Sequence, residues 1–246
     1  MRVKSVVKYN LNEMKNGILI FYGIILLIII LFTISFVSVS INDSHSSLSG
    51  IEMSSAVFLF VVGISFFKQN YLFLSTNGVT RKAQFSGFLV TSVVIAAIMA
   101  AVDTIYGDIL PELVNYNPLF KQAYSGFAAT APNFVTILTG FAWSTFLYLS
   151  MLVLGYFIRV LYYRMSRLLK IVVSIGVPAF YTVILPILDF KFTKGMISKW
   201  ITELCKTMAG LNGGYNPYAG IMFTIMGTVI LACLAYLLMR KAPVKD

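Results

Sequence analysis

The sequence predicts an all-α integral membrane protein with six transmembrane helices, and its composition and hydrophobic pattern both support this class. Of the 246 residues, 59% are hydrophobic and only 11% are charged, whereas soluble domains carry about 25% charged residues. The mean hydropathy is +0.86, so the chain has too few polar groups to cover the surface of a soluble fold. The apolar residues gather in runs of about 20, the length of one membrane crossing. We therefore expect a single transmembrane domain over residues 1–246.

Short polar connections separate the six predicted spans. The spans cover residues 17–39, 54–74, 83–106, 133–158, 169–188 and 217–239. A basic region precedes the first span, but the uncharged run is too long for a signal-peptide core, so we expect it to be retained. The fifth span contains Pro178 and Pro186, which are expected to kink it.

Lysine and arginine are distributed unevenly between the two sides of these spans. Fourteen of the nineteen lie in the N-terminal segment, the 2–3 connection, the 4–5 connection and the C-terminus. The positive-inside rule therefore predicts a plasma-membrane protein with both termini in the cytoplasm. The net charge of +10 does not indicate a nucleic-acid partner, because the basic residues form short clusters between apolar runs.

The N-terminal segment is the first of three amphipathic stretches outside the predicted spans. At 100° per residue, five apolar side chains share one helical arc: Val3, Val7, Leu11, Met14 and Ile18. Lysines occupy the adjoining arc, so the segment is expected to lie on the inner leaflet with membrane lipid as its partner. The alternative is a cytoplasmic extension of the first span.

Residues 67–77 form the second amphipathic stretch. Phe67, Tyr71 and Leu74 fall on one helical face, and Leu72 and Phe73 point elsewhere. A short cytoplasmic helix with two apolar faces indicates a protein partner that buries one of them. The alternative is that the second span simply continues to Leu74.

A tight cytoplasmic turn is expected after this stretch. Gly78 permits a sharp reversal of the chain, and Thr80 is a suitable cap for the third span. Arg81 and Lys82 are expected to hold that end at the cytoplasmic interface.

Residues 192–208 form the third and clearest amphipathic stretch, on the predicted external side. Its apolar half includes Phe192, Met196, Trp200 and Leu204. The stretch is too polar to span, and Trp suits a membrane interface. We expect a helix at the outer surface or dipping into the bundle, with these four side chains facing inward.

The sequence lacks the common motifs of nucleotide-binding, metal-binding and catalytic sites. The sequence has no G-x-x-x-x-G-K-[ST] motif, and its only histidine, His45, cannot build a zinc site or a Ser-His pair alone. Cys205 and Cys233 do not indicate a redox pair. We expect no enzyme activity, no metal site and no bound cofactor. Asp103 is the one candidate carboxylate within the spans, either as an interfacial group or as a substrate contact.

The layout, together with "NGVTRK" at 77–82, resembles the permease subunit of ABC-2-type exporters of the small bacterial type. The resemblance implies a separate ATP-binding subunit, which carries ATP and Mg, and a second permease, identical or homologous. It also implies that residues 67–77 are the coupling helix. The expected ATPase-coupling residues are Phe67, Tyr71, Leu72, Phe73, Leu74, Arg81 and Lys82.

The expected function is thus half of the membrane pathway of an ATP-driven exporter. An amphipathic or antimicrobial peptide or a hydrophobic drug is the expected cargo. The alternatives are a secondary transporter and a non-catalytic membrane assembly protein. An intramembrane protease is disfavoured, because the spans contain no catalytic constellation.

Overall fold

The computed structural model describes residues 3–39, 48–113, 116–212, 216–240 and 242, and this part of the chain is helical almost throughout. Among the described residues, six helical segments are long and apolar enough to cross a membrane. They are Val3–Ile34, Ile51–Thr76, Arg81–Pro111, Asn133–Arg164, Arg167–Lys191 and Pro217–Arg240. The six predicted spans are therefore confirmed as apolar helices, most of them longer than predicted.

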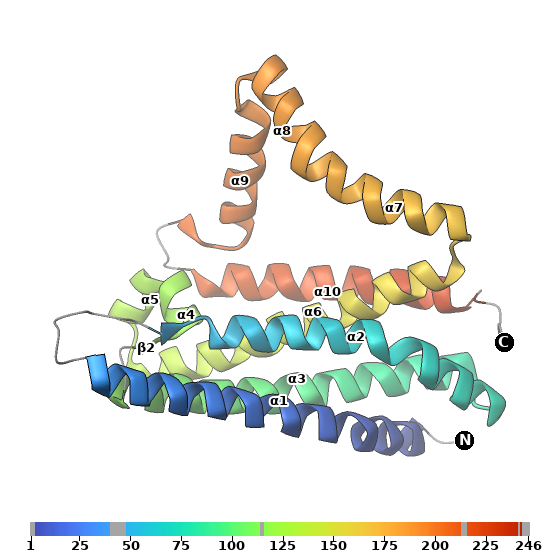
Figure 1. Cartoon of the computed structure of the whole chain (residues 1–246), viewed down its shortest axis with the longest axis horizontal. Helices are drawn as coiled ribbons and strands as arrows, with labels where there is room; N and C mark the ends of the chain where they lie inside the picture. The colour runs from blue at the N-terminus through green and yellow to red at the C-terminus, as the bar shows by residue number, and fades with distance from the viewer. Residues whose placement is uncertain (1–2, 40–47, 114–115, 213–215, 241, 243–246) are drawn as a thin grey trace.

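Five long helices form one bundle (Figure 1). These are α1 (Val3–Val39), α2 (Ile51–Thr76), α3 (Arg81–Leu113), α6 (Asn133–Arg164) and α10 (Pro217–Arg240). At one end lie two short helices, α4 (Leu119–Ala123) and α5 (Ser125–Thr130), and a two-residue parallel ladder. The ladder pairs β1 (Leu48–Ser49) with β2 (Tyr116–Asn117).

Helix α6 is the centre of the bundle and packs against α2, α3 and α10, while α1 packs against α3. Glycines allow the closest of these approaches. A Cβ on Gly63 in α2 would lie 2.3 Å from the backbone oxygen of Leu152, and one on Gly155 in α6 would lie 2.2 Å from that of Phe60. Small residues bring helix backbones together in this way in membranes, where no hydrophobic force drives association.

The N-terminal segment continues the first span and is not a separate helix, so the expectation of a separate interfacial helix is wrong. Helix α1 runs without a break for 37 residues, about 55 Å at 1.5 Å per residue, which exceeds the roughly 30 Å hydrocarbon core. Val6, Asn10 and Met14 recur every four residues and are all buried. This buried face keeps the segment against the bundle as an extension of the first span.

The predicted coupling helix is likewise the end of α2 rather than a separate element. Phe67, Tyr71 and Leu74 are 1%, 2% and 6% exposed, because they pack inside the chain's own core. The alternative, a second span that continues to Leu74, is the structure observed.

A tight turn joins α2 to α3 as predicted. Gly78 has φ of 72°, in the left-handed region that favours glycine. The Val79 amide donates to the Leu74 oxygen at 2.9 Å and so closes the end of α2. Thr80 Oγ1 accepts from the Ala83 amide at 3.4 Å. The reversal places the start of α3 beside the end of α10, where Arg81 Nη1 donates to the Arg240 oxygen at 2.5 Å.

The fifth span stands off from the bundle as an arm that meets it at one end, beside the end of α6, and reaches its tip at α8 (Leu185–Leu188) (Figure 1). It consists of α7 (Arg167–Ala179), a π-helical turn (Phe180–Ile184), α8 and a second π-helical turn (Asp189–Thr193). The π turns follow Pro178 and Pro186, whose rings disturb the regular helical hydrogen bonding. The prolines thus distort the span without ending it.

Helix α9 (Met196–Met208) returns from the tip of the arm toward the bundle (Figure 1). It lies within the predicted amphipathic stretch, but none of its described residues is buried. Met196, Trp200 and Leu204 are 71%, 65% and 37% exposed, so they do not pack against this chain's own bundle. The reason is that the arm leaves the bundle. The side chain of Phe192 lies outside the described residues.

Candidate functional site

A buried polar cluster lies at the end of the bundle opposite the α2–α3 turn. Its first member is Glu52, in the first turn of α2, which is 6% exposed. One carboxylate oxygen accepts from the Tyr116 hydroxyl at 2.5 Å and the other from the Leu119 amide at 3.1 Å. Burial and the nearby Glu52 raise the pKa of Tyr116, so its phenol stays protonated and donates. Glu52 therefore ties the start of α2 to the segment between β2 and α4.

Asp103 in α3 is the second member and is 2% exposed. It follows Ala96 and Met99 on the buried face of α3, so helical spacing turns the carboxylate into the bundle. Tyr22 of α1 donates to Oδ1 at 3.0 Å, and Tyr148 of α6 donates to Oδ2. The structure therefore places Asp103 inside the bundle rather than at an exposed interface.

The two phenols also face backbone oxygens. The Tyr22 hydroxyl lies 3.1 Å from the Met99 oxygen, and the Tyr148 hydroxyl lies 3.2 Å from the Glu52 oxygen. A phenol has a single proton to donate. When Asp103 is ionised, both phenols can donate to it. When Asp103 is protonated, it can donate to one phenol, which then donates to its backbone oxygen. The network thus has partners for either protonation state of Asp103.

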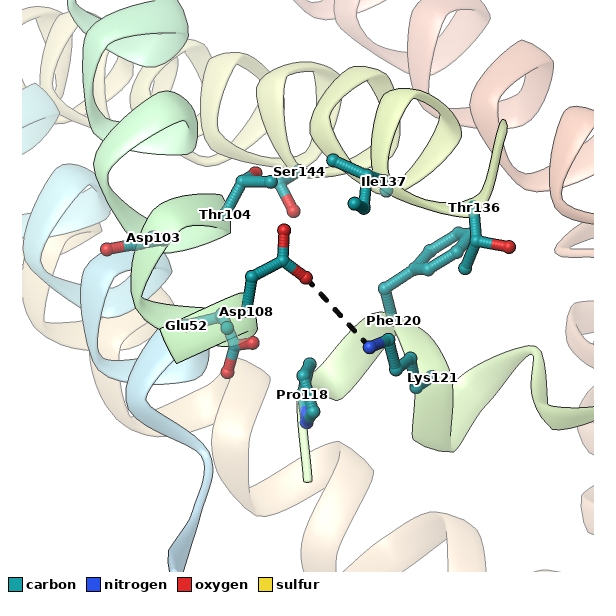
Figure 2. A pocket seen from close by; sticks show the side chains of 12 residues that line it. Glu52, Asp103, Thr104, Asp108, Pro118, Phe120, Lys121, Thr136, Ile137 and Ser144 are labelled. Atoms are coloured by element: carbon teal, nitrogen blue, oxygen red, sulfur yellow. Dashed lines mark ion pairs between the residues drawn. The ribbon is translucent and has the colours of Figure 1, made fainter. Parts of the chain in front are cut away.

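A small pocket of about 40 Å³ adjoins this cluster. Figure 2 shows the Asp108 carboxylate and the Lys121 ammonium facing each other across it, 4.0 Å apart. Both side chains are more than one third exposed, so the ion pair contributes little to stability. The pocket lining is Glu52, Asp103, Thr104, Gly107, Asp108, Pro118, Phe120, Lys121, Thr136, Ile137, Gly140 and Ser144.

The size and charge of the pocket limit what it can bind. Pockets for drug-sized ligands have about 300–1,000 Å³, so this one cannot enclose such a cargo in the observed conformation. Three carboxylic side chains and one ammonium group line the pocket, which favours water or a small cation over an anion. Within the described residues, no group of three His, Cys, Asp or Glu side chains could hold a metal ion. His45 lies outside that part of the chain.

Sequence reasoning missed most of this cluster. Neither Glu52 nor Tyr148 belongs to a motif that indicates a role. One signal was available: Glu52 begins the second span and Asp103 lies near the end of the third. Consecutive spans are antiparallel, so these two carboxylates had to lie at similar depth.

The predicted coupling residues divide into buried and accessible groups. Phe67, Tyr71 and Leu74 are internal, as described above. Phe73 is 49% exposed and stacks on Tyr9, with 4.9 Å between ring centroids. The other members differ too: Leu72 and Arg81 are half-buried and Lys82 is exposed. Only part of the predicted set is therefore available to a partner.

Asp189 is a further polar residue that sequence reasoning did not single out for a role. It is 3% exposed and lies at the end of the arm. Its carboxylate accepts from the amides of Ile197 and Ser198, each at 3.0 Å, and from Thr193 Oγ1 at 2.5 Å. It thereby caps the N-terminus of α9, where a negative charge is favourable, and fixes the bend at the tip.

Comparison of the chain with family models, curated proteins and solved structures gave no match.

Proposed function

We propose that this chain is the membrane-spanning subunit of an ATP-driven exporter in the plasma membrane, with both termini cytoplasmic. ATP and Mg bind a separate ATP-binding subunit, and a second permease, identical or homologous, completes the pathway. This chain forms part of the membrane pathway and catalyses no reaction itself. An amphipathic or antimicrobial peptide or a hydrophobic drug is the proposed cargo, and the resemblance to small ABC-2-type permeases indicates a bacterial origin.

The α2–α3 turn is the observation that carries this proposal. Phe73, Thr76, Asn77, Gly78 and Thr80 are all exposed there. The helices behind the turn are firmly packed, because Tyr71 and Phe67 contact the aromatic ring of Tyr163 in α6. A partner that moves the turn would therefore also move α6, the central helix of the bundle.

Charge at this end supports the cytoplasmic assignment. Arg81 begins α3, Arg164 ends α6, and Arg240 ends α10. The Arg81–Arg240 hydrogen bond joins the ends of α3 and α10, and the ring contact between Tyr71 and Tyr163 joins the ends of α2 and α6. Basic residues gathered at one end of a bundle favour the inner leaflet.

The arm supports the proposal of a second permease. Ile171, Val172, Ile175 and Tyr181 are 57–66% exposed, and α7 has no buried residue. A span that packs so little against its own chain leaves a long apolar surface, which either lipid or a second copy can cover. If a second copy covers the arm, the variant Ile175→Cys should form a disulfide-linked dimer, because the two arms then meet.

Co-purification tests the main proposal. The tagged chain is co-expressed with candidate ATP-binding subunits from its own genome and solubilised in mild detergent. We expect one of them to remain bound and its ATPase rate to change when the permease is present. Purification without any such subunit, while the chain stays folded, would contradict the proposal.

A secondary transporter is the second candidate, and the Asp103 network specifically favours it. Buried carboxylates that tolerate both protonation states are used for proton coupling. Glu52, Asp108 and Lys121 line the same pocket as Asp103. In proteoliposomes without any ATPase, substrate uptake driven by a pH gradient and lost in Asp103→Asn would favour this alternative.

A further inference from the structure

Three amide side chains from three helices meet at a second, smaller cavity near the α2–α3 turn. Asn10 of α1, Asn70 of α2 and Gln84 of α3 are 1%, 3% and 4% exposed. They line a cavity of about 10 Å³. The remaining lining is Phe66, Phe67, Tyr71, Leu74, Phe88, Tyr156 and Met239.

Each amide has one buried polar atom that no group in the described part of the chain satisfies. These atoms are Oδ1 of Asn10, Nδ2 of Asn70 and Oε1 of Gln84. Two of the three amides are already held at their other atom. Asn70 Oδ1 faces the Tyr9 hydroxyl at 3.5 Å, and Gln84 Nε2 donates to the Val79 oxygen at 2.9 Å. Buried polar atoms rarely remain unpaired, so three at one cavity indicate a bound partner.

We propose that this cavity holds one ordered water molecule. Water can donate its two protons to Asn10 Oδ1 and Gln84 Oε1 and accept one from Asn70 Nδ2. A buried water typically makes about three such bonds, and its site needs roughly 10–15 Å³. The number of polar partners, their donor and acceptor types and the volume of the cavity all match the requirements of one water molecule.

Other occupants fit less well. No charged side chain lines the cavity, so a bare ion would be buried without a counter-charge. The Asn70 N–H donor would repel a cation, and the two amide oxygens would repel an anion. The volume leaves no room for a larger molecule.

The water connects the turn to the rest of the bundle. Gln84 holds the turn through the Val79 oxygen and the Ser75 hydroxyl, the latter at 3.2 Å. Its other atom reaches the water, and through it α1 and α2. The site therefore joins three helices by hydrogen bonds at the place where a partner would act, and its existence does not depend on the proposed function.

Radiolytic hydroxyl-radical footprinting of the full chain in nanodiscs tests the proposal, because ordered internal waters label the side chains beside them. Met239 and Met99 are matched probes, since they are 1% and 0% exposed and only Met239 lines this cavity. We expect oxidation of Met239 to be several-fold faster than that of Met99. Equal, slow oxidation of both would overturn the proposal.

A cavity-filling variant separates bound water from bulk solvent. In Asn10→Leu/Asn70→Leu/Gln84→Met the three partners become apolar, and oxidation of Met239 should fall to the rate of Met99. Unchanged oxidation would mean that bulk solvent is responsible and would refute the site. If the triple variant does not fold, Asn70→Met, whose longer side chain fills the cavity, replaces it.

A second measurement distinguishes water from an ion. The melting temperature of the wild-type chain should be the same in Na⁺, K⁺ and choline salts. A melting temperature that depends on the cation would overturn the water assignment.

Discussion

The Tyr148 hydroxyl in α6 hydrogen-bonds the Asp103 carboxylate in α3 and lies 3.2 Å from the backbone oxygen of Glu52 in α2. One phenol thus joins three helices at a place where both carboxylates are buried. In a membrane, such a polar junction has no bulk water to replace it.

Removal of this phenol should destabilise the bundle. Tyr148→Phe removes one hydrogen-bond donor from a buried carboxylate. We expect the free energy of unfolding to fall by about 1–2 kcal/mol, which lies between the average for hydrogen bonds in membrane proteins and the value for hydrogen bonds to charged groups. We expect the melting temperature in detergent to fall by a few degrees. The control is Tyr236→Phe in α10, whose hydroxyl has no hydrogen bond within the described residues and which should melt like wild type. Equal melting of both variants would contradict the role of Tyr148.

The contact between α2 and α6 should not tolerate a side chain at Gly155. A Cβ there would lie 2.2 Å from the Phe60 oxygen, so Gly155→Leu must force the two helices apart. We expect a loss of roughly 1–3 kcal/mol or more, seen as aggregation in size-exclusion chromatography. Gly227→Ala in α10 is the control, since nothing lies within 4 Å of its Cβ position. A monodisperse Gly155→Leu protein would reject the close contact.

Membrane topology can be tested by cysteine labelling after both native cysteines are replaced by serine. The positive-inside rule predicts that Arg2→Cys and Asp246→Cys are labelled only from the cytoplasm and Lys199→Cys only from outside. Arg2 and Asp246 lie outside the described residues, whereas Lys199 lies in the described α9. External labelling of either terminus would reject the proposed orientation.

Phe73 is the test of the proposed ATPase contact. Because Phe73 is 49% exposed, Phe73→Ala should leave the bundle folded. Truncation of an interface hot spot typically costs 2 kcal/mol or more, so ATPase association should weaken by about tenfold or more.

Phe67→Ala is the contrasting variant. Phe67 is 1% exposed, so its truncation should lower expression rather than coupling. Pull-down of the ATPase by folded protein separates the two effects. If Phe73→Ala retains the partner and its stimulated ATPase rate in full, the turn is not the site of ATPase contact.

Helix α9 should be sensitive to charge on its apolar side. Trp200 is 65% exposed on an unburied helix, so Trp200→Lys should impair membrane association or assembly with a second copy. Lys194→Glu should matter much less, because it changes a residue that is already charged. Crosslinked dimer yield measures both variants, and equal losses would count against an oriented helix.

The sequence alone determined that this is a helical membrane protein and where its spans lie. Hydropathy is a local property of about 20 consecutive residues, so composition suffices to place a span. The turn at Gly78 was predictable for a similar reason, since its backbone conformation depends on the residue itself. Glycine needs no tertiary contact to adopt it.

Tertiary structure decided which predicted segments were separate. Residues 3–18 and 67–77 are amphipathic enough to lie on a surface, but each continues a span because one of its faces packs inside the bundle. Amphipathicity shows that a face will be buried, but not whether lipid, another protein or the same chain buries it.

The order of the spans indicated that Glu52 and Asp103 lie at similar depth, but their meeting with Tyr148 was decided by tertiary structure. Tyr148 is 45 residues from Asp103 and 96 from Glu52. Their meeting depends on how closely α2 and α6 approach, which Gly63 and Gly155 control through contacts far apart in the chain. The separation of the arm from the bundle is also a tertiary outcome, because an apolar helix has the same hydropathy whether lipid or protein surrounds it.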